Sequence, residues 1–278
     1  FMTVQGTGAM SIIVADVGIN NRDDPTGSLI TLSLLTGIVM ILAGALKFGS
    51  FLRFVSNSVM TGFISAVGVN IVLGQLGNFT GYDGRGANRV TKTFDLLLHL
   101  GSMHFMTLLV GVVTVILIVV LQRTRLGALG LVVAIFAGSV LAAVLRSQGH
   151  EVALVSDIVA VPNSLPGLGW PILSEVPVMI LPALSLAFVG LVQGAGVSAG
   201  FPNRDGSPTD ASQDFVGQGV GNIASGLFQG MPVGGSLSAG SLVVSAGARG
   251  RTSLLCAAGV VAIVLTFMSS MVERVAMP

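Results

Sequence analysis

Residues 228–251 read FQGMPVGGSLSAGSLVVSAGARGR, and they decide the fold because glycines, serines and a proline interrupt an otherwise apolar chain. The apolar part of this stretch, residues 236–248, is too short to cross a membrane. At ~1.5 Å per residue it covers only about two thirds of a ~30 Å hydrocarbon core. Pro232 and the glycines around it disfavour a helix just before it. The stretch therefore predicts an extended segment that leads into a half-helix beginning near the middle of the membrane.

A second stretch near the start of the chain has the same pattern. Residues 7–19, TGAMSIIVADVGI, form an apolar run of the same length, and TVQG at residues 3–6 precedes it. Non-helical backbone at membrane depth is tolerated only where protein buries it or where it lines a cavity. We therefore expect the two breaks to meet. Two short segments interrupted by glycine or proline are the best sequence indication of a transporter's binding site.

The composition predicts an integral membrane protein. Of 278 residues, 52% are hydrophobic and 9% are charged, whereas soluble domains carry about 25% charged residues. The net charge of +1, without any run of basic or acidic residues, gives no indication of a nucleic-acid partner. Cys256 is the single cysteine and the three histidines are scattered, so we expect no disulfide framework, no metal cluster and no cofactor.

Six further segments are long enough to span a bilayer, which requires about 20 mostly apolar residues. They are residues 28–46, 56–77, 104–121, 126–145, 177–199 and 252–270. A more polar segment, residues 213–229, carries Gly217, Gly221, Gly226 and Gly230, whose four-residue spacings predict close packing against other helices. Six segments separate the two half-helices, so the second runs in the opposite direction through the membrane, as in inverted repeats.

The basic residues predict the orientation of the chain. The short connections Lys47–Arg53, Arg123–Arg125 and Arg249–Arg251 contain basic residues and no acidic ones. Alternate counting of the spans places all three on one side, and the positive-inside rule makes that side cytoplasmic. Residues 78–102 and 146–176 are then expected to be outer loops.

The two half-helix starts predict an anion site. A helix that begins inside the bilayer presents about four unpaired N–H groups and roughly half a positive charge. If two such starts face each other, backbone amides and hydroxyls can hold an anion without lysine or arginine. The expected substrate-binding residues are Thr7, Gly8, Ala9, Gln193, Gly235, Ser236, Leu237, Ser238 and Ala239. The alternative is a tight helix-packing contact rich in small residues.

Gln193 has the surroundings of a cavity wall. Gly190, Gln193, Gly196 and Gly200 follow one another at three- and four-residue spacing, so one helix face is small and carries a single amide. This amide either contacts a ligand or forms a hydrogen bond between helices, and the residues alone leave both roles open.

Three motifs carry a resemblance to a known family. They are QGTGAM at residues 5–10, GALKFGSFLRFVSNSVMTGFISAVGVNIVLGQL at 44–76, and SQDFVGQGVGNIASGLFQGMPVGGSLSAGSLVVSAGARGRTSL at 212–254. The chain resembles the transmembrane core of the sulfate permease (SulP) anion transporters, from their third to their eleventh helix. The resemblance implies an all-α integral membrane fold in two inverted repeats of seven segments, divided into core and gate domains. It also implies an anion between the third and tenth helices, and a homodimer.

The same resemblance bears on individual polar residues. It favours a ligand contact for Gln193, whereas Asn222, which is also similar to a family position, is expected to form a hydrogen bond between helices. Residues 1–278 are expected to be one partial transporter domain from the middle of a longer protein. The cytoplasmic STAS domain that many family members carry is expected to lie outside this chain.

The sequence departs from the family at two positions. Ala239 stands where the tenth-helix motif has arginine, and Gln193 stands where many members have a carboxylate. Removing one partner of a buried ion pair costs about 3–5 kcal/mol, whereas replacing both can be neutral. Our hypothesis is that the two charges were lost as a pair, which leaves a site that holds its anion by helix ends and hydroxyls alone.

The sequence therefore predicts a secondary transporter of a small inorganic anion, sulfate by family default, that works by alternating access in the plasma membrane. Alternatives are another anion of the same family (bicarbonate, chloride or a dicarboxylate), a nucleobase, or an anion channel or non-transporting membrane scaffold. The coupling ion stays open. An intramembrane enzyme is disfavoured because no nucleophile with a base and no metal-binding spacing occurs.

Overall fold

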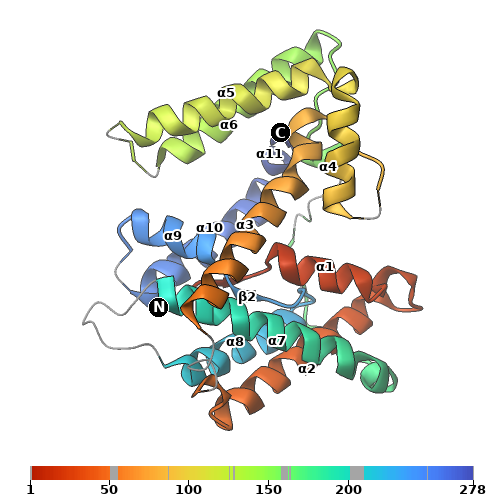
Figure 1. The fold of residues 1–278 in the computed structure, drawn as a ribbon, viewed down its shortest axis with the longest axis vertical. Coiled ribbons are helices and arrows are strands. Elements are labelled where there is room, and N and C mark those ends of the chain that lie inside the picture. Colours follow the sequence, from red (N-terminus) through yellow and green to blue (C-terminus); the bar gives the residue numbers. More distant parts are fainter. Residues whose placement is uncertain are drawn as a thin grey trace. The chain divides into compact units, whose positions relative to one another are not determined.

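The computed structural model describes residues 2–50, 56–86, 88–124, 126–127, 129–157, 162, 164–200, 210–248 and 250–277 (Figure 1). The chain divides into two compact units. The first comprises Phe1–Ser65, Pro166–Val244 and Arg249–Arg251, and the second comprises Ala66–Leu165, Ser245–Ala248 and Thr252–Pro278. Parts of the predicted basic connections, namely residues 51–55, Arg125 and Arg249, lie outside the described residues.

Both units are built mainly from helices. The first contains β1 Val4–Gln5, α1 Gly8–Asp16, a 3-10 helix Ile19–Asn21, α2 Pro25–Ala45, a 3-10 helix Leu173–Glu175, α7 Val176–Gly200, α8 Ala211–Leu227, β2 Gly234–Gly235 and all but the last residue of α9 Leu237–Ser245. The second contains α4 Arg89–Leu98, a 3-10 helix Leu100–Ser102, α5 Phe105–Gln122, α6 Leu129–Ser147, a 3-10 helix Val155–Asp157, most of α10 Arg251–Phe267, and α11 Ser269–Glu273. Helix α3, Asn57–Thr80, contributes to both units.

The helices agree with the predicted spans. Within the described residues, four are long and apolar enough to cross a membrane: Pro25–Ala45, Phe105–Gln122, Leu129–Ser147 and Leu173–Ser198. Helices α3, α8 and α10 coincide with the remaining predicted segments to within a few residues. The expectation of an all-α membrane protein is confirmed.

The two predicted strand-to-half-helix breaks are present, and they meet. Strands β1 and β2 pair antiparallel, with Val4 opposite Gly235 and Gln5 opposite Gly234. Each leads into a helix of 9 residues, α1 and α9. Such a helix is about 13 Å long, less than half of the hydrocarbon core. Both half-helices end before a glycine with positive φ, Gly18 at 68° and Gly247 at 86°, a conformation that glycine adopts without strain.

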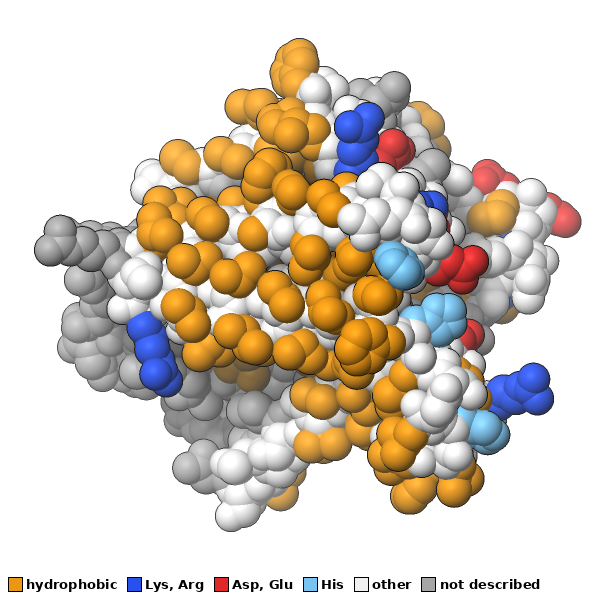
Figure 2. Space-filling view, turned by 90° about the horizontal axis from the view of Figure 1, so that it is seen from above, with side chains coloured by type: hydrophobic (Ala, Val, Ile, Leu, Met, Phe, Trp, Pro, Cys, Tyr) orange, Lys and Arg blue, Asp and Glu red, His pale blue; other side chains and the backbone are white. Residues whose placement is uncertain are grey.

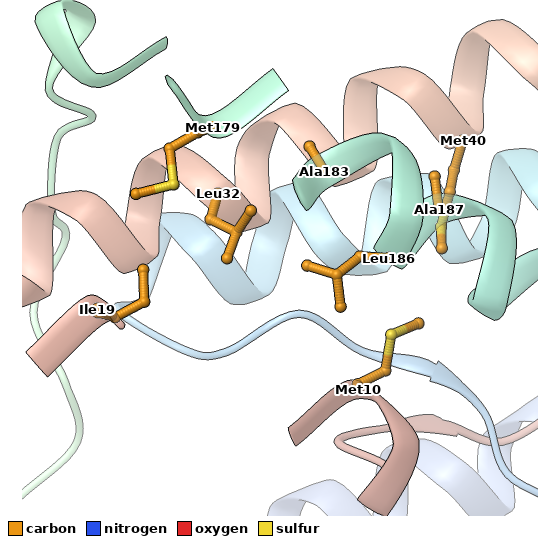
Figure 3. Packing of buried hydrophobic residues seen from close by; sticks show 8 residues of the cluster. All are labelled: Met10, Ile19, Leu32, Met40, Met179, Ala183, Leu186 and Ala187. Atoms are coloured by element: carbon orange, nitrogen blue, oxygen red, sulfur yellow. The ribbon is translucent and has the colours of Figure 1, made fainter. Parts of the chain in front are cut away.

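The first half-helix is held by a hydrophobic cluster in the first unit. Figure 3 shows its buried members converging from α1, the adjoining 3-10 helix, α2 and α7: Met10, Ile19, Leu32, Met40, Met179, Ala183, Leu186 and Ala187. Met10, in the first turn of α1, is completely buried. The start of this half-helix is therefore anchored to two spanning helices, although α1 itself is too short to be stable alone.

Helices α2 and α8 pack backbone to backbone at Gly37 and Gly219, which the spacing did not indicate, and at Gly226, which it did. A Cβ on Gly219 would lie 2.7 Å from the Gly37 carbonyl oxygen, and the converse holds for a Cβ on Gly37. Around Gly217, by contrast, no described atom other than those of adjacent residues and the surrounding helix backbone lies within 4 Å of a Cβ. The prediction that Gly217 mediates close packing is therefore wrong. Gly226 does lie against α2, 3.2 Å from the Ile30 carbonyl oxygen by the same measure.

Gly219→Ala is expected to destabilise the full-length protein, and Gly217→Ala serves as its matched control on the same helix. The added methyl group at position 219 overlaps the α2 backbone, and overpacking of this kind costs typically about 1–3 kcal/mol. At position 217 the helix propensity of alanine, about 1 kcal/mol better than that of glycine, acts without a clash. Thermal unfolding in detergent measures both. Equal melting temperatures for the two variants would contradict the proposed close contact.

In the second unit, α5 and α6 form an apolar pair. Gly138 of α6 faces Thr114 of α5 so closely that a Cβ would overlap the threonine hydroxyl. Figure 2 shows hydrophobic side chains covering the outer face of this pair. Exposed members include Val115, Ile116 and Val119 on α5 and Val132, Phe136 and Val140 on α6. A continuous exposed apolar face on helices of spanning length fits contact with lipid.

Helix α4 was not predicted, since residues 78–102 were expected to be a loop. Asn88 caps this helix, and the Thr91 side chain completes a capping box. Its polar side is fixed to the preceding segment: the Arg85 N–H and the Tyr82 hydroxyl donate to Asp95 at 2.8 and 2.9 Å. These two hydrogen bonds, that from Arg85 foremost, hold the pKa of the Asp95 carboxyl below its usual range.

Candidate functional site

The start of α1 is built around Thr7. Thr7 has extended backbone geometry, and its Oγ1 accepts a hydrogen bond from the Met10 N–H at 3.3 Å, which makes it the N-cap. Its hydroxyl donates to Gln193 Oε1 on α7 at 3.1 Å. The N–H groups of Gly8 and Ala9 find no acceptor among the described residues. This half-helix therefore presents two free backbone donors at its start.

The start of α9 is built around Ser236 in the same way. The Ser236 hydroxyl oxygen accepts from the Ala239 N–H at 3.2 Å and from Gln5 Nε2 at 3.1 Å. The next two N–H groups, of Leu237 and Ser238, have no acceptor in the described part of the chain. The Ser238 side chain is exposed, and its Oγ lies 3.3 Å from Ser236 Oγ.

The hydroxyls are thus more engaged than the sequence suggested. The single proton of the Thr7 hydroxyl is directed at Gln193, and Ser236 is buried as a cap. Gln193 forms the hydrogen bond between helices that was one of its two possible roles. Its role as a ligand contact stays a prediction. Ser238 is the predicted hydroxyl that combines exposure with a free N–H group.

The glycines at the two half-helix starts differ in their surroundings, because those of β2 are packed against α7 and Gly8 is open. A Cβ on Gly234 would lie 2.9 Å from Gln193 Oε1, and a Cβ on Gly235 would lie 3.1 Å from the Gly194 Cα. The glycines of β2 therefore allow the strand and α7 to touch, and substrate contact by Gly235 stays a prediction. Around Gly8, no described atom other than those of adjacent residues and the surrounding helix backbone lies within 4 Å of a Cβ. Gly8 is the position at which a ligand could approach the backbone.

Two polar residues on α8 support β2. The Asn222 side chain bonds to both backbone groups of Val233, and Gln218 Oε1 accepts from the Gly235 N–H at 3.1 Å. Asn222 was expected to bond between helices, and its Nδ2 does donate to Met40 Sδ of α2 at 3.4 Å. In addition, it holds the extended segment before β2. Gln218 was not singled out. The available signal was the spacing of two carboxamides four residues apart on one face of an otherwise small-residue helix.

The positive potential of this arrangement comes from helix ends. None of the residues predicted to bind substrate is ionisable, and both Gln193 and Ala239 are neutral. Two helix N-termini together supply about one positive charge in partial charges. In the low dielectric of a membrane interior such partial charges act strongly on an anion. The geometry fits recognition of a small anion by backbone N–H groups.

Comparison with known proteins places the chain in a family. A family model described as the sulfate permease family matches residues 2–277. The chain belongs to the sulfate permease family. This confirms the resemblance found in the motifs, and the match to a permease family confirms that the chain is not an enzyme.

Relatives in this family carry names for different anions. The chain is 29% identical over 243 residues to the probable sulfate transporter MT1781 of Mycobacterium tuberculosis, covering 87% of this chain and 43% of that protein. It is 27% identical over 257 residues to the bicarbonate transporter BicA of Synechocystis, covering 91% and 44% respectively. The chain thus spans less than half the length of these relatives.

A solved structure confirms the fold. The transmembrane domain of a cyanobacterial bicarbonate transporter BicA superposes with a TM-score of 0.77 at 19% identity, covering 99% of this chain and 72% of that one. The likeness agrees with the inverted-repeat architecture expected for sulfate permease family members.

Proposed function

We propose that the protein is a secondary transporter that moves a small inorganic anion across the membrane by alternating access. The observation that supports this proposal is the antiparallel pairing of β1 with β2, each strand leading into a half-helix with two free N–H groups. Such discontinuous helices with inward-facing N-termini are the typical anion sites of inverted-repeat transporters. The anion is held by Gly8, Ala9, Leu237 and Ser238 through their backbone N–H groups.

Sulfate is the proposed substrate, because relatives that match most of this chain are named sulfate transporters. Bicarbonate is the second candidate, and the charge of the site favours it. Two helix ends supply about one positive charge, which balances a monoanion better than a dianion. Gln193 and Ala239 add no charge to this total. The proposal also includes a homodimer in the plasma membrane, with residues 1–278 as part of its transporter domain.

Uptake of labelled sulfate by the full-length protein in proteoliposomes tests this function. Bicarbonate, chloride, fumarate and uracil serve as competitors. Saturable uptake with counterflow is expected, since a carrier binds one substrate in each cycle. Uptake of bicarbonate without competition by sulfate would keep the site and change the substrate. A large conductance that neither saturates nor shows counterflow would instead indicate a channel.

A further inference from the structure

The second strand of the pair has an edge that β1 does not cover. In an antiparallel pair, successive residues direct their N–H and C=O groups to opposite sides. Ser236 directs its N–H toward β1, where it donates to the Thr3 carbonyl oxygen at 2.9 Å. Gly235 and Val233 therefore direct their N–H groups to the other side. A third strand would normally bond to this edge, and α8 lies there instead.

Two carboxamides of α8 occupy the positions of that missing strand. Asn222 Oδ1 accepts from the Val233 N–H at 2.9 Å, and Asn222 Nδ2 donates to the Val233 carbonyl oxygen at 2.7 Å. Gln218 Oε1 accepts from the Gly235 N–H at 3.1 Å. Both side chains are 0% exposed. Two residues of strand advance about 6.8 Å and four residues of helix about 6.0 Å, so groups four residues apart on a helix match alternate residues of a strand.

Gln218 stabilises β2 by accepting the hydrogen bond from the Gly235 N–H. Its Nε2 is buried without a hydrogen-bond partner in the described chain, and it fits beside α7 because Gly194 has no side chain there. A buried donor without a partner costs free energy. An apolar side chain of equal size would avoid that cost, but it would leave the N–H group of the buried Gly235 without its hydrogen bond.

We propose that Gln218 and Asn222 are positioning residues that aim the start of α9 at the anion. The proposal rests on the proposed function. By holding Val233 and Gly235 in extended geometry, the two carboxamides fix where the helix begins. The N–H groups of Leu237 and Ser238 then stay free for the ligand. Neither carboxamide needs to touch the anion.

Gln218→Met and Gln218→Asn test this proposal in the full-length protein. Methionine keeps the volume without the acceptor, and asparagine keeps the amide but is too short to reach Gly235. Both variants are expected to raise the KM for the transported anion about tenfold, the effect of one lost hydrogen bond of about 1.4 kcal/mol. Vmax per folded protein should change less than about twofold. Amide hydrogen exchange across residues 233–240 should become faster.

Ser225→Ala is the matched control. Ser225 also lies on α8 and also holds the connection to β2, through its hydroxyl and the Met231 carbonyl oxygen at 2.7 Å. Its bond lies farther from α9, so KM and exchange at residues 233–240 should stay at wild-type values. A lower melting temperature with unchanged KM and unchanged exchange in the Gln218 variants would overturn the proposal. If the wild-type protein takes up none of the anions, the proposed function fails, and hydrogen exchange still decides whether Gln218 fixes this helix start.

Discussion

Replacing Ser238 by tryptophan abolishes saturable anion uptake, with an expected loss of at least about 100-fold, equivalent to about 2.7 kcal/mol of binding free energy. Ser238 is exposed in the first turn of α9, and its N–H group has no acceptor among the described residues. An indole at this position occupies the space into which the free N–H groups of Leu237 and Ser238 point. Uptake in proteoliposomes, corrected for the amount of folded protein, measures the effect.

Ser245→Trp provides the control for this substitution. Ser245 is also exposed and also on α9, at the other end of the helix. At ~1.5 Å per residue it lies about 10 Å along the axis from Ser238. The same side chain is thus introduced into the same helix, away from its N-terminus, and uptake should remain within about twofold of wild type. Wild-type uptake by the Ser238→Trp variant would place the anion elsewhere.

The strand and half-helix pairs could be predicted because they depend on segment length and on local backbone preference. A run such as residues 236–248 cannot span a bilayer, and Pro232 cannot continue a helix. Both facts can be seen in the local sequence. The general rule that irregular backbone at membrane depth needs a protein partner then applies to each break. That the two breaks meet follows from these facts, whereas the register, with Val4 opposite Gly235, does not.

Which glycines of α8 contact a neighbouring helix could not be predicted, because spacing alone does not show which side of a helix faces its neighbour. Gly217 and Gly219 lie two residues apart on α8, and only the second touches α2. Helix α4 was missed for a different reason. A helix that does not span the membrane is stabilised by its Asn88 cap and by contacts with its own loop, and a search for apolar segments does not detect it.

The residues of the candidate site could be chosen from the sequence, but their hydrogen bonds could not. Sequence shows that Thr7 and Ser236 are hydroxyls at helix starts, but not that capping and Gln193 already engage them. Gln218 bonds the side of β2 that faces away from β1, and the sequence does not show which side of β2 that is. The four-residue spacing places Gln218 and Asn222 on one helix face, but it does not show which backbone groups the two side chains bond.

Gln193→Glu and Ala239→Arg restore the two charges that family members carry at these positions. Made singly and together, they test whether the two charges were lost as a pair. Gln193→Glu keeps the acceptor for the Thr7 hydroxyl at 3.1 Å but adds a charge in a nearly buried position. Ala239→Arg adds a positive charge within the first turn of α9, where the helix dipole is already positive. Each change alone introduces an unpaired charge, which costs up to about 3–5 kcal/mol. Each single variant should therefore lose stability and at least about tenfold in uptake.

The double variant is expected to recover both properties, since the two charges then compensate each other. The coupling free energy from the double-mutant cycle should reach about 1–3 kcal/mol, measured by unfolding in detergent and by uptake. A second cycle that combines Gln193→Glu with Ala239→Met supplies the control, because methionine adds a long side chain without charge, and there the effects should be additive. If the charged cycle is additive to within about 0.5 kcal/mol as well, positions 193 and 239 are not partners. The neutral site would then owe nothing to a lost ion pair, and each position would be explained by its own contacts, Gln193 by the bond from Thr7 and Ala239 by its place in the cap of Ser236.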